Sequence, residues 1–245
     1  MGVNMKKLNI VFLAIFTTIF LSSCISNNFA IKANEPVAIL SVRGTLNVPW
    51  LEERDDDYKD LDGMITNSIN KIFGKNNPEI QTAQDRINYA DEQFAYLLET
   101  NMGITVVSKD KIINSKQYKA ITPSIFTFSD TKIYADNYKK IDEIGSQKTK
   151  LLLRELNAKS TIFVTFTFNK KVVEGSKLKG QITASVTMDV DVYDCKGHQK
   201  IMDTFTADSS QLVEILKTNY DKDALVELFP EIIDLVINQF IVKYM

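Results

Sequence analysis

Apolar and polar residues alternate over positions 182–193 with the period of a β-strand. The even positions are apolar and the odd positions are mostly polar: Ile182, Ala184, Val186, Met188, Val190 and Val192 against Thr183, Ser185, Thr187, Asp189, Asp191 and Tyr193. Because successive side chains point to opposite faces of a strand, this pattern predicts a long antiparallel strand with one buried and one solvated face. Turn residues 194–197 follow, and residues 199–206 are expected to return as the hairpin partner.

Three more apolar runs predict strands. Residues 37–42 and 104–107 are short and almost uniformly apolar, which is typical of strands buried on both faces. Residues 161–168 alternate instead, with four large side chains on one face: Ile162, Val164, Phe166 and Phe168.

Apolar residues three and four positions apart predict helices in the remaining segments. Helical spacing covers residues 61–72 and 87–98, and a shorter helix begins after Ser108, a candidate N-cap. A long helix over 135–157 would bury Tyr138, Ile141, Ile144, Leu152 and Leu156. After residue 210 the chain is expected to end in helix, with Pro230 as a candidate kink and with one apolar face made of Leu225, Leu228, Ile232, Leu235, Val236 and Phe240.

This order of elements predicts an α/β domain. A single mixed β-sheet would be covered by helices, with an antiparallel C-terminal half and a terminal helix. No internal repeat interrupts that order, so residues 36–245 are expected to form one domain.

Residues 1–24 have the pattern of an export signal. Lys6 and Lys7 precede an apolar run of roughly a dozen residues, shorter than the about 20 that span a bilayer. The run ends in Leu21-Ser22-Ser23-Cys24, which resembles the lipobox of bacterial lipoproteins. That resemblance implies cleavage before Cys24, a diacylglycerol on its thiol and a fatty acyl chain such as palmitate on its new amino terminus. The alternative is an ordinary secretory signal with an incidental cysteine.

The signal divides the chain into a cleaved peptide (1–23), a lipidated tether (24–35) and the α/β domain (36–245). Two or more acyl chains attach a protein stably to a membrane. Residues 25 and 26 are Ile and Ser, so the acidic residue that resembles an inner-membrane retention signal is missing, which favours the outer membrane. The expected location is the cell envelope, with both the periplasmic face and the cell surface left open.

Charge and cysteine content exclude two classes of protein. The chain has 29 basic and 31 acidic side chains, and cleavage removes Lys6 and Lys7, so the net charge changes from −2 to about −4. A mildly acidic chain does not have the charge pattern of a nucleic-acid-binding protein. Once Cys24 is lipidated, Cys195 is the remaining thiol, so this is not a disulfide-stabilised fold.

Residues with catalytic or metal-binding chemistry are few and scattered. His198 is the only histidine and shares a turn signal with Cys195, which favours solvated side chains over a hydrolase or zinc site. Residues 55–62 carry five aspartates, but their spacing is not that of an EF-hand, and a solvated loop is the preferred interpretation. No phosphate-binding glycine motif is present. We therefore expect no catalytic, cofactor or metal residues, and a protein that is not an enzyme.

A basic hairpin tip and a lone tryptophan are the candidate contact sites. Residues 169–171 and 177–179 place lysines on both sides of a turn, where they would meet an acidic partner, anionic lipid headgroups or only solvent. Trp50 lies in an irregular polar stretch over residues 45–62. It would serve either as an interface anchor or as a cover for the domain's own core.

The element order, together with local residues, resembles a bacterial envelope superfamily. Its members include the curli-secretion lipoprotein, the lipoprotein activators of penicillin-binding proteins and the amino-terminal domain of TolB. The matching segments are 37–40, 105–109, 156–158 and 190–197, within a resemblance that covers 36–243 apart from 45–58 and 122–134. It implies a non-catalytic, lipid-anchored partner or assembly protein.

The expected function is therefore to bind another envelope protein and to position or regulate it, with residues 45–57 and the lysine tip as contacts. One alternative is a subunit of a homo-oligomeric secretion channel, because residues 161–168 and 182–193 come near the necessary hairpin length. Another is a surface-exposed lipoprotein that binds a ligand or host molecule. Self-association is left open.

Overall fold

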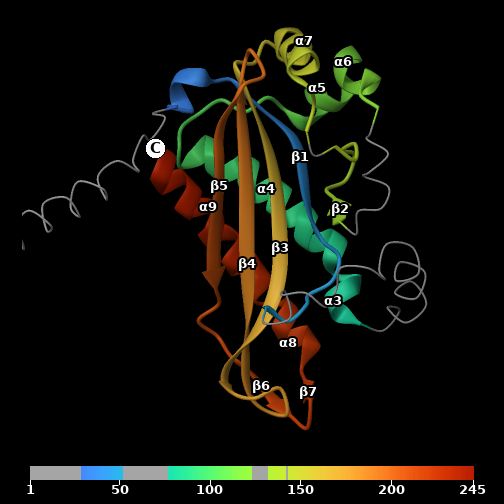
Figure 1. The fold of residues 1–245 in the computed structure, drawn as a ribbon, viewed down its shortest axis with the longest axis vertical. Helices are drawn as coiled ribbons and strands as arrows, with labels where there is room; N and C mark the ends of the chain where they lie inside the picture. Colours follow the sequence, from blue (N-terminus) through green and yellow to red (C-terminus); the bar gives the residue numbers. More distant parts are fainter. Residues whose placement is uncertain (1–28, 52–76, 123–131, 142) are drawn as a thin grey trace, which may run out of the picture.

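The computed structural model describes residues 29–51, 77–122, 132–141 and 143–245 (Figure 1). Its strands are β1 Val37–Thr45, β2 Lys132–Tyr134, β3 Ser160–Gly175, β4 Lys179–Asp194, β5 Gln199–Asp208, β6 Val213–Leu216 and β7 Asn219–Tyr220. Its helices are η1 Lys32–Asn34, α3 Pro78–Gln81, α4 Ala83–Thr100, α5 Lys109–Asn114, α6 Lys116–Ala120, α7 Ser146–Leu156, α8 Lys222–Val226 and α9 Phe229–Tyr244.

The strands form one mixed sheet in the order β2-β1-β3-β4-β6-β7, and β5 also pairs with β4. β1 runs parallel to β3, and the other pairs are antiparallel. β3 and β4 have 16 residues each and extend along most of the molecule (Figure 1). The α/β class, the antiparallel C-terminal half and the terminal helix are thus confirmed.

Helices α4 and α9 cover one face of the sheet (Figure 1). The even-numbered residues predicted to be buried in β3 and β4 pack on this side, among them Phe166 and Met188. The ring of Phe240 in α9 lies 5.9 Å from that of Phe94 in α4 and 5.7 Å from that of Phe205 in β5. Aromatic side chains contribute large buried areas, so these contacts explain why α9 remains on the sheet.

A second, smaller core lies on the opposite face, beneath α5, α6 and α7. It contains Leu40 of β1, Phe163 of β3 and Leu152 of α7. Tyr118 of α6 is buried among them, and its hydroxyl donates to the carbonyl oxygen of Leu40 at 3.1 Å. These helices lie over the end of the sheet where β1 begins (Figure 1).

The strand predicted at 104–107 is wrong, because these residues form only one bridge, between Val37 and Val106. The Val37 N–H donates to Thr105 at 2.9 Å, and the Val107 N–H donates back to Val37 at 2.8 Å. Farther along, β2 occupies this edge of β1 with Arg43 opposite Tyr134. After this bridge the chain enters α5 at Lys109, so the apolar run is not continued as a strand.

The helix predicted over 135–157 is wrong in its first half, because α7 begins at Ser146. Asn137 has a φ of 69°, in the left-handed region, where a regular α-helix cannot continue. Ile141 and Ile144 are buried as predicted, but from an irregular segment. Helical spacing of apolar residues thus identified the buried positions and not the backbone that carries them.

The C-terminal prediction missed β6 and β7, which precede the last helices. Lys217 and Thr218 have φ values of 53° and 70°, as in the tight turns of two-residue hairpins. Pro230 lies in the first turn of α9, where its missing N–H is tolerated, so it does not kink the helix. Leu235 is 44% exposed and is not part of the buried face.

Ser108 occupies the N-cap of α5 without a side-chain capping bond, and the helix predicted at 61–72 lies outside the described residues. Across the described parts of the chain, no helix is both long and apolar enough to span a bilayer.

Candidate partner-binding tip

Two hairpins meet at one end of the sheet and form a surface that we call the distal tip, residues 172–181 and 212–220. β6 pairs with the start of β4, so Lys179 lies opposite Leu216 and Gly180 opposite Ile215. The N–H of Thr218 also donates to the carbonyl oxygen of Leu178 at 3.3 Å. The two turns are thus held together by backbone bonds.

Glycines fix the shape of the first turn. Gly175 has a φ of 79°, which favours glycine, and it pairs with Gly180. A Cβ on Gly180 would lie 2.1 Å from the carbonyl oxygen of Glu174, so no side chain fits there. The register also shifts between Val172 and Glu174, which marks a bulge at Val173.

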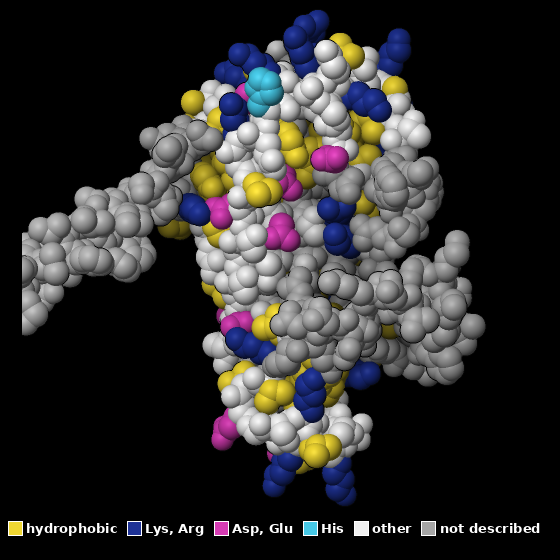
Figure 2. Space-filling model, in the orientation of Figure 1, with side chains coloured by type: hydrophobic (Ala, Val, Ile, Leu, Met, Phe, Trp, Pro, Cys, Tyr) yellow, Lys and Arg dark blue, Asp and Glu magenta, His cyan; other side chains and the backbone are white. Residues whose placement is uncertain are grey.

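Aliphatic side chains are exposed on this tip. Leu178 is 66% exposed, Leu216 54% and Val173 51%. Figure 2 shows hydrophobic and lysine side chains gathered at this lower end of the molecule. The charges are mixed, because exposed lysines alternate with acids: Lys179, Lys217, Glu174 and Glu214.

A buried ion pair lies between the tip and the rest of the domain. The ammonium group of Lys170 in β3 lies 3.1 Å from both carboxylate oxygens of Glu79 in α3 and also donates to the carbonyl oxygen of Val48. The side chains of the pair are 8% and 7% exposed. A buried charge needs a partner and hydrogen bonds to be tolerated, and Lys170 has both.

Aromatic rings lie next to this ion pair. The hydroxyl of Tyr220 in β7 donates to Glu79, and burial together with that carboxylate raises the Tyr220 pKa far above its usual value. Trp50 packs edge-on against Tyr220, with ring centroids 6.1 Å apart. The ammonium groups of Lys170 and Lys177 lie 5.3 Å and 4.9 Å from the Trp50 ring centroid. We call Glu79, Lys170, Trp50 and Tyr220 the hub.

Arg86 of α4 lies near the hub. Its guanidinium carbon lies 4.9 Å from the ring centroid of Phe168 and 5.1 Å from that of Phe229. Burial lowers the Arg86 pKa to about 10, against the opposing effect of the Glu79 charge. The hub and Arg86 together join α3, α4, β3, β7 and the segment after β1.

The predicted lysine tip is only partly correct. Lys177 and Lys179 lie on the tip, but Asn169 and Lys170 are buried, and Lys171 forms an ion pair with Asp208 of β5. The strand pattern contained the missed signal, because position 170 continues the even-numbered buried face of residues 162–168. Trp50 is half-buried against the other hub residues, so it packs on its own domain.

His198 and Cys195 lie at the opposite end, in the exposed turn between β4 and β5. The carboxylate of Asp194 accepts the backbone N–H groups of Lys196 and His198 at 2.8 and 2.9 Å. Burial alone would raise the Asp194 pKa, but these bonds outweigh it and hold the pKa below its usual value. Cys24 and the aspartates of residues 55–62 lie outside the described residues.

No protein-family model matches this chain, and a search of curated proteins likewise finds no match.

Proposed function

We propose that this is a lipid-anchored, non-catalytic protein of the bacterial envelope that binds another envelope protein through the distal tip and positions or regulates it. The lipobox-like sequence at Cys24 supports the anchor. The observation that carries the binding role is the exposure of Val173, Leu178 and Leu216 on two joined hairpins.

The rigidity of the tip favours recognition of a protein surface. Binding costs less when the contacting groups are already ordered, and the hub fixes both hairpins to the sheet. Protein interfaces have a more apolar, desolvated centre and a polar, solvent-accessible rim. Exposed aliphatic residues flanked by lysines and glutamates have that composition.

Crosslinking in intact cells tests the proposal. A photoreactive amino acid replaces Leu178 in one strain and Leu216 in another, and the control strain carries it at Met202, which is 79% exposed on β5. We expect both tip positions, and not Met202, to join the same envelope protein. Cys24→Ser should remove fatty-acid incorporation and release the protein from the membrane.

Other crosslinking patterns would overturn the proposal. A ladder at multiples of the protein's own mass from the tip positions would support the homo-oligomeric channel subunit instead. Crosslinks that form only with added host or ligand molecules would support a surface-exposed binding lipoprotein. Identical products from Leu178 and Met202 would show that the tip has no specific role.

A further inference from the structure

The end of the domain opposite the tip carries the N-terminal segment. The Ser160 hydroxyl donates to the carbonyl oxygen of Asn34 at 2.8 Å, and Ser160 pairs with Asp194 at the end of β4. Gly197 in the next turn approaches Ser146, the first residue of α7. We call this end, with η1, the β4–β5 turn and the start of α7, the proximal end (Figure 1).

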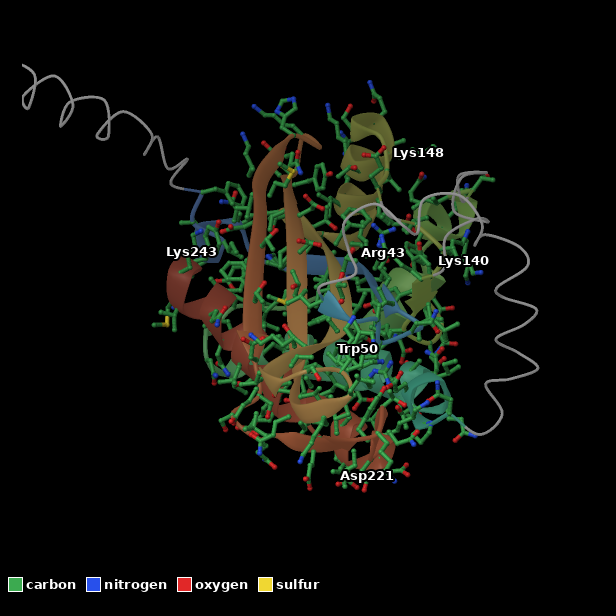
Figure 3. The ribbon with its side chains drawn as sticks, turned by 60° about the horizontal axis from the view of Figure 1, so that its bottom comes forward. Arg43, Trp50, Lys140, Lys148, Asp221 and Lys243 are labelled. Carbon is green, nitrogen blue, oxygen red and sulfur yellow. The ribbon has the colours of Figure 1, made fainter. Side chains whose placement is uncertain are left out.

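Four exposed lysines distinguish the proximal end: Lys32, Lys148, Lys159 and Lys196. The upper part of Figure 2 shows lysine and arginine side chains around this end, and Figure 3 labels Lys148 there. Among the described residues, none of these four ammonium groups has an ion-pair partner. Their charges are therefore directed to solvent.

Nearby acidic groups are occupied by bonds within the domain. Glu35 accepts the Thr105 N–H at 2.6 Å. Glu155 accepts the N–H groups of Lys116 and Gln117 at 2.7 and 2.8 Å. Asp194 is bonded to its own turn and lies 3.3 Å from Lys200. Glu143 also has a partner. These carboxylates keep their negative charge but are held by bonds within the domain, whereas the four lysine ammonium groups have no such partner among the described residues.

We propose that the proximal end docks on the anionic phospholipid headgroups of the bilayer that holds the protein, an inference that rests on the proposed lipid anchor at Cys24. Four residues separate Cys24 from Phe29, so the five Cα–Cα steps between them span at most about 18 Å. The lysines are thus kept near the headgroups, and each Lys close to an anionic surface is attracted to it. Since the acyl chains already supply attachment, the lysines set the orientation.

This orientation holds the distal tip away from the bilayer. β4 runs from Lys179 at the tip to Asp194 at the proximal end, and its 16 residues rise about 50 Å. A partner protein bound to the distal tip would therefore lie well outside the headgroup layer.

Fluorescence quenching tests the docking. The lipidated protein is reconstituted in vesicles of phosphatidylethanolamine with either phosphatidylglycerol or phosphatidylcholine, each with a headgroup-quencher lipid. A fluorophore on the exposed Cys195 reports on the proximal end, and one on Leu178→Cys in a Cys195→Ser background reports on the tip. We expect quenching of the Cys195 probe in phosphatidylglycerol vesicles, weakened by salt, and no quenching at the tip.

Charge variants make the test specific. Lys148→Gln and Lys159→Gln should each lower the ratio of docked to undocked protein about five-fold, whereas Lys179→Gln at the tip should not change it. Equal quenching of Cys195 in both vesicle types, or quenching of the tip probe, would overturn the docking.

Failure of the anchor can be told apart from failure of docking. Mass spectrometry of the purified protein reports whether Cys24 is acylated. An unmodified Cys24 would refute the proposed anchor. The unmodified chain would then be mixed with phosphatidylglycerol vesicles. Sedimentation of the chain with the vesicles would support the charged docking end independently of the anchor, and a chain that stays in the supernatant would refute it.

Discussion

Glu79→Gln is expected to destabilise the protein by about 3 kcal/mol, because it leaves the Lys170 ammonium buried without its counter-charge. Removing one partner of a buried ion pair costs about 3–5 kcal/mol. The lower end of that range applies because glutamine keeps the shape of Glu79 and retains one oxygen acceptor 3.1 Å from Lys170. The bond that Tyr220 donates to Glu79 loses its charge assistance as well.

A double-mutant cycle separates the ion pair from general disruption. Lys170→Met should also cost about 3 kcal/mol, because the Glu79 carboxylate is then left buried. The double variant should cost about as much as either single change, because it leaves no unpaired buried charge but still loses the hydrogen bonds of the pair and buries the glutamine amide. We therefore expect a coupling free energy near 3 kcal/mol.

Urea unfolding followed by two probes measures these values. The chain has one tryptophan, Trp50, and it contacts the hub, so its fluorescence reports on that region. Circular dichroism reports on the whole domain. Asp208→Asn is the control, because its ion pair with Lys171 is partly exposed and should contribute below about 1 kcal/mol. A double variant whose cost equals the sum of the single costs would refute the coupling.

Three further predictions follow from particular contacts. Gly180→Ala should lower the free energy of unfolding by about 1–3 kcal/mol through overpacking, measured by urea unfolding. Gly145→Ala is its control: a Cβ there has no atom within 4 Å, so this variant should stay within about 0.5 kcal/mol of wild type. Phe240→Ala should cost about 3–5 kcal/mol by the same measurement. Burial raises the Tyr118 pKa to about 12. The neutral Tyr118 hydroxyl therefore contributes its full stabilisation of the fold below about pH 10, and this contribution is lost as the pH rises through about 12. In thermal unfolding, Tyr118→Phe should reduce the loss of stability at alkaline pH.

The sequence predicts the sheet better than the helices for a physical reason. A strand buried on one face must alternate, and residues 182–193 do so without interruption, so β4 and the burial of its even-numbered face follow directly. The odd-numbered face is not solvated throughout as predicted, because Thr183 and Ser185 are buried. Burial alone does not specify backbone, however, and Ile141 and Ile144 reach the core without belonging to a helix. The left-handed Asn137 that separates them from β2 leaves no periodic signal.

The tip could be predicted only in part, because its chemistry comes from pairs far apart in the chain. Glu79 and Lys170 are separated by 91 positions, and Glu79 and Tyr220 by 141. Nothing local to Lys170 identifies its partner, although the alternation already places it on the buried face. The exposed Leu216 depends on β6 and β7, whose four and two residues are too short for a periodic pattern.

The hub and the proximal end should be separable by mutation, because Lys170 of the hub and Ser160 of the proximal end lie ten positions apart along β3. Glu79→Gln loosens the attachment of α3 and Tyr220 near the tip, so crosslinking from Leu178 should fall. The same change leaves Lys148 and the β4–β5 turn untouched, so quenching of a Cys195 probe by anionic vesicles should persist. Loss of both signals in a variant that remains folded by circular dichroism would show that the two ends do not act independently.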